Sequence, residues 1–135
     1  MSWDIFVQDL PTDARTFEEI PEDFVPVPLG SRAAIIDRIK EVAPAADFSD
    51  PSWGHLDEPG FSIEFNMGNK EECRSFAFHV YGADAAAGVV AAILEHLKLR
   101  ALDSQTGGFF EAGESARESL RRWRAYRDQI VKENR

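Results

Sequence analysis

Large hydrophobic residues alternate with polar or small ones along two neighbouring stretches of this chain, 61–67 and 76–80. Successive side chains of a strand point to opposite faces of a sheet, so each stretch predicts a strand with one apolar and one polar face. The short polar stretch between them predicts an antiparallel hairpin, with its apolar face on a core and its polar face near water. The apolar positions are Phe61, Ile63, Phe65, Met67, Phe76, Phe78 and Val80.

The alternation also limits the register of the hairpin. In one register, the numbers of paired residues sum to 143, which places Phe65 opposite Phe78 on the apolar face and Glu64 opposite His79 on the polar face. In the rival register the numbers sum to 141. Glutamate beside histidine is a weak candidate for a catalytic acid–base couple, because the carboxylate stabilises the protonated ring and orients it. The alternative is a solvent-facing ion pair worth roughly a few tenths of a kcal/mol.

The residues before the hairpin predict a strand, a belt and a helix. Residues 3–10 are rich in β-branched and aromatic side chains, on both parities, which predicts a strand in contact on both faces. Residues 11–30 contain four prolines and show no periodicity, but they are too apolar for a free linker, so we expect an ordered belt with one short helical turn at most. Ser31 is a good N-cap for a helix that Pro44 ends.

The remaining elements complete an α+β pattern. A short strand is expected within 47–58, a helix over 85–99 after Asp84, a strand at 101–103, and a basic helix within 114–135 that starts at a capping box of Ser115 and Glu118. The order β-α-β-β-β-α-β-α predicts one two-layer α+β domain over 1–135, with helices on one face of a mainly antiparallel sheet.

Charge narrows the classes of partner. The net charge is −9, and residues 114–135 hold seven basic against four acidic side chains, while residues 1–113 hold eight against twenty. An acidic body of net charge −12 repels phosphate backbones, so nucleic acid is not expected as a partner. The basic helix, at +3, is expected to neutralise its own acidic body or that of a second subunit.

Other features set the expected compartment. No apolar run approaches the roughly 18 residues of a membrane-spanning helix, and the N-terminus shows no secretory pattern. The lone Cys73 cannot form an internal disulfide, which fits a reducing compartment, so the expected location is the cytoplasm.

Few residues suggest chemistry. His55, His79 and His96 have no metal-ligand spacing, Cys73 has no paired base, and no cofactor fingerprint is present, so neither a metal nor a cofactor is expected. Phe109 and Phe110 follow two glycines in a predicted turn, where an exposed aromatic pair would fit a protein contact. Core packing, or a pocket between sheet and belt, are the alternatives. The acidic residues of the belt form the other predicted binding surface: Glu18, Glu19, Glu22 and Asp23.

Three segments also carry a resemblance: residues 3–11, residues 47–54, and the stretch from the hairpin through the second helix to Leu102 and Asp103. Together they resemble a family of small bacterial proteins usually described as hypothetical or uncharacterised. The likeness covers most of residues 1–110 and weakens in the third helix. It implies a bacterial cytosolic origin and implies no activity, cofactor or catalytic residue.

Two functions follow from these patterns. The first is a non-catalytic interaction or regulatory protein that binds a protein partner or itself, for example by neutralising a basic protein. The second is a small-ligand-binding protein or modest enzyme with a cleft near Glu64 and His79. A deep apolar pocket at those two residues would favour the second, and a flat sheet face with a self-complementary patch would favour the first.

Overall fold

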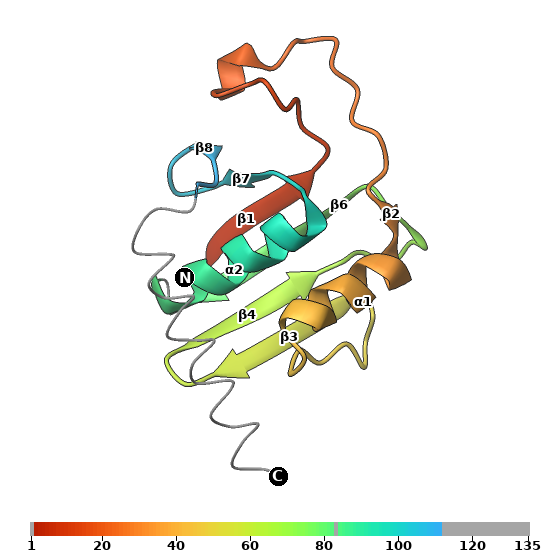
Figure 1. The fold of residues 1–135 in the computed structure, drawn as a ribbon, viewed down its shortest axis with the longest axis vertical. Coiled ribbons are helices and arrows are strands. Elements are labelled where there is room, and N and C mark those ends of the chain that lie inside the picture. The colour runs from red at the N-terminus through yellow and green to blue at the C-terminus, as the bar shows by residue number, and fades with distance from the viewer. Residues whose placement is uncertain (1, 83, 112–135) are drawn as a thin grey trace.

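The computed structural model describes residues 2–82 and 84–111, where two α-helices pack on one face of a six-stranded sheet (Figure 1). The strand order is β3-β4-β6-β1-β7-β8, and every neighbouring pair is antiparallel. The predicted two-layer α+β fold is thus confirmed. The elements of the sheet and the helices are β1 (Trp3–Gln8), α1 (Arg32–Val42), β3 (Trp53–Glu58), β4 (Phe61–Asn66), β6 (Ser75–Tyr81), α2 (Asp84–Leu97), β7 (Ala101–Asp103) and β8 (Gly108–Phe109).

The predicted hairpin is formed by β4 and β6 in the register that sums to 143. Phe65 pairs with Phe78 and Glu64 with His79, as predicted. On the other side of β6 lies β1, which also pairs with β7 and is therefore an inner strand. On its core side Ile5 and Val7 are fully buried, whereas Phe6 on the other side is 45% exposed, so the expected contact on both faces is confirmed only for the core side.

The core lies between the sheet and the two helices. The alternate positions of β1, β4 and β6 are buried on this side, while α1 and α2 contribute their apolar stripes, so all seven apolar positions of the hairpin pattern are buried as predicted. A slip of one residue would expose all of them, so this burial fixes the register. The most deeply buried side chains include Ile5, Val7, Ile39, Ile63, Phe65, Phe78, Val80, Val89, Val90 and Ile93.

The helix ends follow local signals. The Ser31 hydroxyl accepts a hydrogen bond from the Ala34 N–H at 3.1 Å and caps α1, as predicted. The second helix ends at Leu97, two residues before the predicted end. Lys98 adopts a positive φ of 56°, and the Leu99 N–H then donates back to the Leu94 carbonyl. This Schellman arrangement ends the helix although no glycine marks the position.

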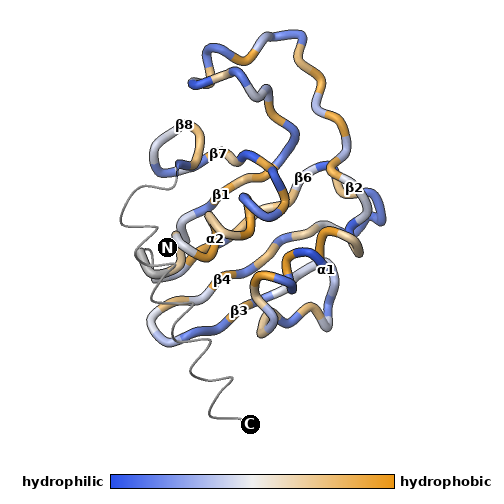
Figure 2. Tube along the Cα trace, viewed as in Figure 1, coloured by the Kyte–Doolittle hydropathy of each residue, from blue (hydrophilic) through white to orange (hydrophobic). Residues whose placement is uncertain are grey.

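The belt, residues 11–30, arches along one end of the sheet, and it mixes apolar and polar residues along its length (Figure 2). It contains one short 3-10 helix, η1 (Phe17–Glu19), which agrees with the single helical turn that was expected. A small second cluster of Leu10, Ala14 and Phe109 anchors its first half. Its far end is held by a two-stranded ribbon, in which β2 (Gly30–Ser31) pairs with β5 (Glu72–Cys73).

The strand expected within 47–58 occupies only its second half. Asp47 pairs with His55 of β3 through two backbone hydrogen bonds, so the first half folds back along the outer edge of the sheet. Gly54 allows this return, because a Cβ at its position would overlap the ring of Phe48. The returning chain covers part of an edge that would otherwise offer free backbone groups.

The predicted third helix, 114–135, lies outside the described residues. Within the described part of the chain, neither helix has the length and apolar character needed to cross a membrane.

Candidate functional site

The side of the sheet opposite α1 and α2 is the candidate site, because the strands place most of their polar side chains there. We call it the polar face. Parity and register assign to it Asp4, Phe6, Gln8, Trp53, His55, Asp57, Ser62, Glu64, Asn66, Ser75, Ala77, His79, Tyr81 and Leu102. None of these strand residues is a lysine or an arginine.

Four titratable side chains form a row across the polar face. The register places His55 opposite Glu64, Glu64 opposite His79, and His79 opposite Asp4. Directly opposed Cβ atoms on neighbouring strands are about 5 Å apart, so acidic and imidazole groups alternate within reach of one another.

The His79 ring is held in place by Asp4 and Trp53. Its Nδ1 lies 2.7 Å from the Asp4 carboxylate, and its plane is stacked on the Trp53 indole, with ring centroids 5.5 Å apart and an interplanar angle of 19°. The carboxylate also accepts a 2.6 Å hydrogen bond from the Ser2 hydroxyl. The hydrogen bonds from His79 and then Ser2 lower the pKa of Asp4 and outweigh its desolvation.

The structure therefore corrects the predicted Glu64–His79 couple. The two residues are opposite each other as predicted, but the ring of His79 bonds to Asp4 and not to Glu64. The reason is topological, because β1 flanks β6 on the side away from β4 and brings a second carboxylate to the ring. The sequence pattern places Asp4 on the polar side of the first strand. It would have identified Asp4 as the partner of His79 only if the pairing of β1 with β6 had been known. A catalytic role for Glu64 and His79 stays a prediction.

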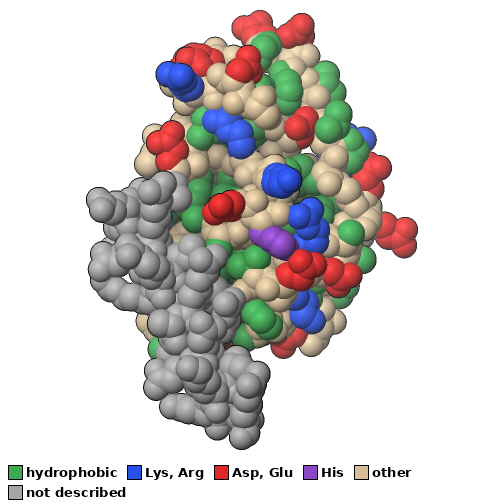
Figure 3. Space-filling view, in the orientation of Figure 1, with side chains coloured by type: hydrophobic (Ala, Val, Ile, Leu, Met, Phe, Trp, Pro, Cys, Tyr) green, Lys and Arg blue, Asp and Glu red, His purple; other side chains and the backbone are tan. Residues whose placement is uncertain are grey.

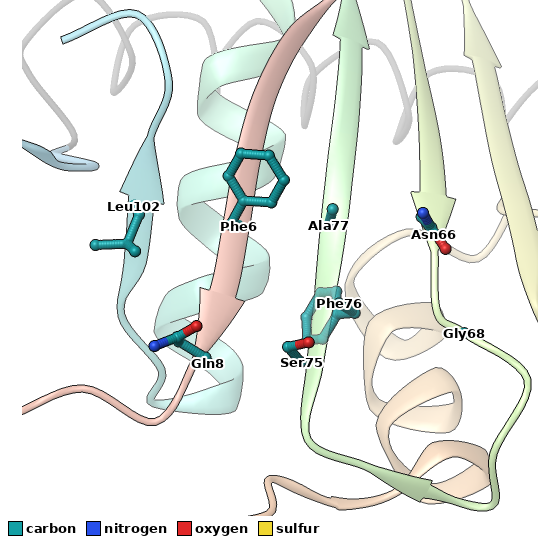
Figure 4. A pocket seen from close by; sticks show the side chains of 8 residues that line it. All are labelled: Phe6, Gln8, Asn66, Gly68, Ser75, Phe76, Ala77 and Leu102. Carbon is teal, nitrogen blue, oxygen red and sulfur yellow. The ribbon is translucent and has the colours of Figure 1, made fainter. Parts of the chain in front are cut away.

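Three large aromatic side chains of the polar face reach solvent. Phe6 is 45% exposed, Trp53 40% and Tyr81 39%. Beside Phe6 lies a groove of about 400 Å³ that crosses β1, β6 and the end of β4, with Ala77 between Phe6 and Asn66 (Figure 4). Among the described residues, this groove is open to solvent on one side, and neither Glu64 nor His79 lines it.

The belt carboxylates, Glu18, Glu19, Glu22 and Asp23, are all exposed. Acidic side chains gather at the top of the space-filling view, where the belt lies (Figure 3). The Glu19 side chain accepts a 2.6 Å hydrogen bond from the backbone N–H of Arg15, which ties it to the start of η1. The belt therefore presents negative charge at the edge of the polar face without forming a cavity.

The prediction that Phe109 and Phe110 form an exposed pair is wrong. Phe109 is only 8% exposed, meets Phe17 of the belt edge-on with centroids 5.8 Å apart, and lies under the Arg100 guanidinium at 3.9 Å. Phe110 packs on Trp3 at 5.9 Å and is half-buried. The two rings anchor the belt and the N-terminal strand, so core packing, the stated alternative, explains their position.

The remaining cysteine and histidine side chains do not form a common cluster. The Cys73 side chain is buried, which raises the pKa of its thiol, and the thiol donates to the Ser75 carbonyl at 3.4 Å. His55 lies 3.7 Å from Asp47, and His96 of α2 lies 2.8 Å from Glu41 of α1. Among the described residues, no three histidine, cysteine or acidic side chains come together as metal ligands.

Comparisons with known proteins return no relative: no family model, no curated protein and no solved structure matches this chain. The resemblance to small bacterial proteins therefore stays a prediction, and the functional argument depends on the residues of the site.

Proposed function

We propose that this protein is a non-catalytic interaction protein that binds a basic protein partner through the polar face of its sheet. The observation that carries the proposal is the exposure of Phe6, Trp53 and Tyr81 on the side opposite the helices. Exposed aromatic side chains among polar residues are typical of protein contacts, where they supply large rigid contact areas.

Charge indicates the kind of partner. Residues 1–113 carry a net charge of −12, and the polar face holds Asp4, Asp57 and Glu64 without a lysine or arginine among its strand residues. A basic partner is attracted by this field and encounters the protein faster at low salt. A second copy fits less well, because a symmetric contact would bring the same acidic groups face to face.

The experiment compares capture by variants of the polar face and by a matched variant elsewhere. Phe6→Ser with Tyr81→Ser removes two exposed rings of the face, and Phe17→Ser removes a ring of similar exposure, 38%, from the belt. Proteins captured from the host extract are identified by mass spectrometry, and the purified candidate is then measured by calorimetry. We expect the double variant to lose the partner and Phe17→Ser to retain it. Equal capture by the wild type, the double variant and Phe17→Ser would refute the proposal.

A second candidate function, small-ligand binding or modest enzymatic activity near Glu64 and His79, is supported by the orientation of His79. Its Nδ1 is engaged by Asp4, and no described side chain bonds to Nε2, which is the arrangement in which an imidazole can transfer a proton. Substituting His79 alone by Gln removes the imidazole and leaves Phe6, Tyr81 and Glu64 of the contact surface in place, so it separates the two functions. Loss of the cellular phenotype with partner binding intact would favour this candidate.

A further inference from the structure

Among the described residues, none pairs with the Glu64 carboxylate, which lies on β4 in the polar face. Its side chain is half-buried on β4, between His55 and His79, and it makes neither a hydrogen bond nor an ion pair with a described residue. Its acidic neighbour Asp4 is engaged by His79 and Ser2. A partly desolvated carboxylate without a cation is stabilised by a partner that supplies one.

An ordered aromatic plane lies next to this carboxylate. Trp53 is on β3 and His79 on β6, with β4 between them, and the register sets Trp53 opposite Asn66 and His79 opposite Glu64. Two strand spacings and an offset of two residues place their Cα atoms roughly 12 Å apart. Their stacking at 5.5 Å between centroids requires both rings to lean across β4, where Glu64 and Asn66 are the polar-face residues. Asp4 fixes the His79 ring, so the indole is supported before any partner arrives.

We propose that Glu64 and Trp53 form a subsite for an arginine side chain of the protein partner. This inference rests on the proposed function and names the group that is recognised. A guanidinium can donate two parallel hydrogen bonds to the Glu64 carboxylate while its plane lies against the exposed part of the Trp53 ring. Lysine offers a compact, strongly hydrated charge and no plane, so the subsite discriminates between the two cations.

The groove indicates how the rest of the segment lies. It runs past Asn66 and Ala77 toward Phe6 and Leu102, and it has an apolar wall on the side away from Glu64. Arginine bound at Glu64 would direct the neighbouring residues of an extended segment along the groove, where Phe6 can contact an apolar side chain. The occupant is therefore a basic protein segment in which arginine stands next to apolar residues.

The test titrates the full chain with two acetylated heptapeptides, one alternating arginine with valine and the other alternating lysine with valine. Calorimetry measures the affinity, and the indole N–H signal of Trp53 in an ¹⁵N spectrum reports contact. The variants are Glu64→Gln, which keeps the shape of the side chain, Trp53→Leu, and the control Glu95→Gln, an exposed acidic residue on α2.

The expected result is an affinity about fivefold higher for the arginine peptide, with a loss of about tenfold in Glu64→Gln and in Trp53→Leu, the size of a single desolvated contact. Glu95→Gln should bind like the wild type. Equal binding of both peptides, or binding unchanged by Glu64→Gln, would overturn the subsite and leave only attraction by the acidic body. Self-association that Glu64→Gln abolishes would assign the subsite to a second copy and also overturn it.

The outcome is separable from the proposed function. If the native partner is lost with Phe6→Ser and Tyr81→Ser but bound normally by Glu64→Gln, the polar face is the contact surface and the arginine subsite is wrong. If the native partner is bound normally by the double variant, the proposed function itself fails, whatever the peptides do.

Discussion

Replacing Phe65 and Phe6 separately by alanine should show that the two faces of the sheet have different roles. Phe65 is fully buried, with ring contacts to Phe48 at 5.2 Å and Phe78 at 5.6 Å. Removing a buried phenylalanine costs about 3–5 kcal/mol of unfolding free energy. Phe6 keeps 45% of its surface exposed. If full burial contributes about 1.5–3 kcal/mol, its partial burial contributes roughly 1 kcal/mol.

Urea denaturation followed by far-UV circular dichroism measures both changes against the wild type. A domain is stabilised by roughly 5–15 kcal/mol, so Phe65→Ala should remove about a fifth of the total or more, while Phe6→Ala should shift the midpoint slightly. The pair is matched, because both substitutions remove the same side chain from an inner strand of one sheet. A larger loss at Phe6 would show that the faces are assigned the wrong way round, and equal losses would show that the two faces do not differ in burial.

Three further predictions concern the edge, the His79 ring and the belt. Gly54→Ala should destabilise by about 1–3 kcal/mol in the same urea assay, because its methyl group would overlap the packed ring of Phe48, and an unchanged midpoint would contradict that overlap. The hydrogen bond from His79 lowers the pKa of Asp4, so its carboxylate stabilises the fold above about pH 4 and this contribution is lost as the pH falls through the lowered value. The stability advantage of wild type over Asp4→Asn should therefore be larger at pH 6 than at pH 2.5, and a pH-independent difference would contradict the linkage. Replacing the belt carboxylates Glu18, Glu19, Glu22 and Asp23 by lysine should lower the association rate constant for the basic partner, chiefly at low salt, and leave the dissociation rate constant nearly unchanged. Surface plasmon resonance measures both constants. A higher dissociation rate constant would show that the belt lies inside the contact.

The hairpin could be predicted because its signal is local and repeated. Alternation at seven positions determines which side of each strand is buried, and a common apolar face then limits the register to two possibilities. The helix that follows Ser31 was equally local, since the cap and Pro44 mark its two ends. In these cases the energy that selects the structure comes from residues close together in the sequence.

The pairing of β1 with β6 could not be predicted, because it joins distant residues, from Gln8 with Ser75, 67 positions apart, to Trp3 with Val80, 77 positions apart. No local pattern states which strands become neighbours, so the partner of His79 was assigned to Glu64 of the same hairpin and not to Asp4. The same limit applies to Phe109, whose burial depends on contact with Phe17 of the distant belt. Its position after two glycines suggested exposure, but the aromatic contact decided the outcome.

The exposed aromatic surface was predicted on a loop, and the structure places it on the sheet. The sequence placed exposed aromatic residues at Phe109 and Phe110, whereas the structure uses Phe109 to hold the belt and leaves Phe6, Trp53 and Tyr81 exposed on strands. A side chain that projects from a paired strand has little backbone freedom left to lose, so ordering it in a complex costs less entropy than ordering a loop. A rigid aromatic face can therefore provide short-range affinity while the belt carboxylates provide long-range attraction. This division is physically sensible because attraction between charges extends over a Debye length of about 8 Å, and aromatic contact requires direct packing.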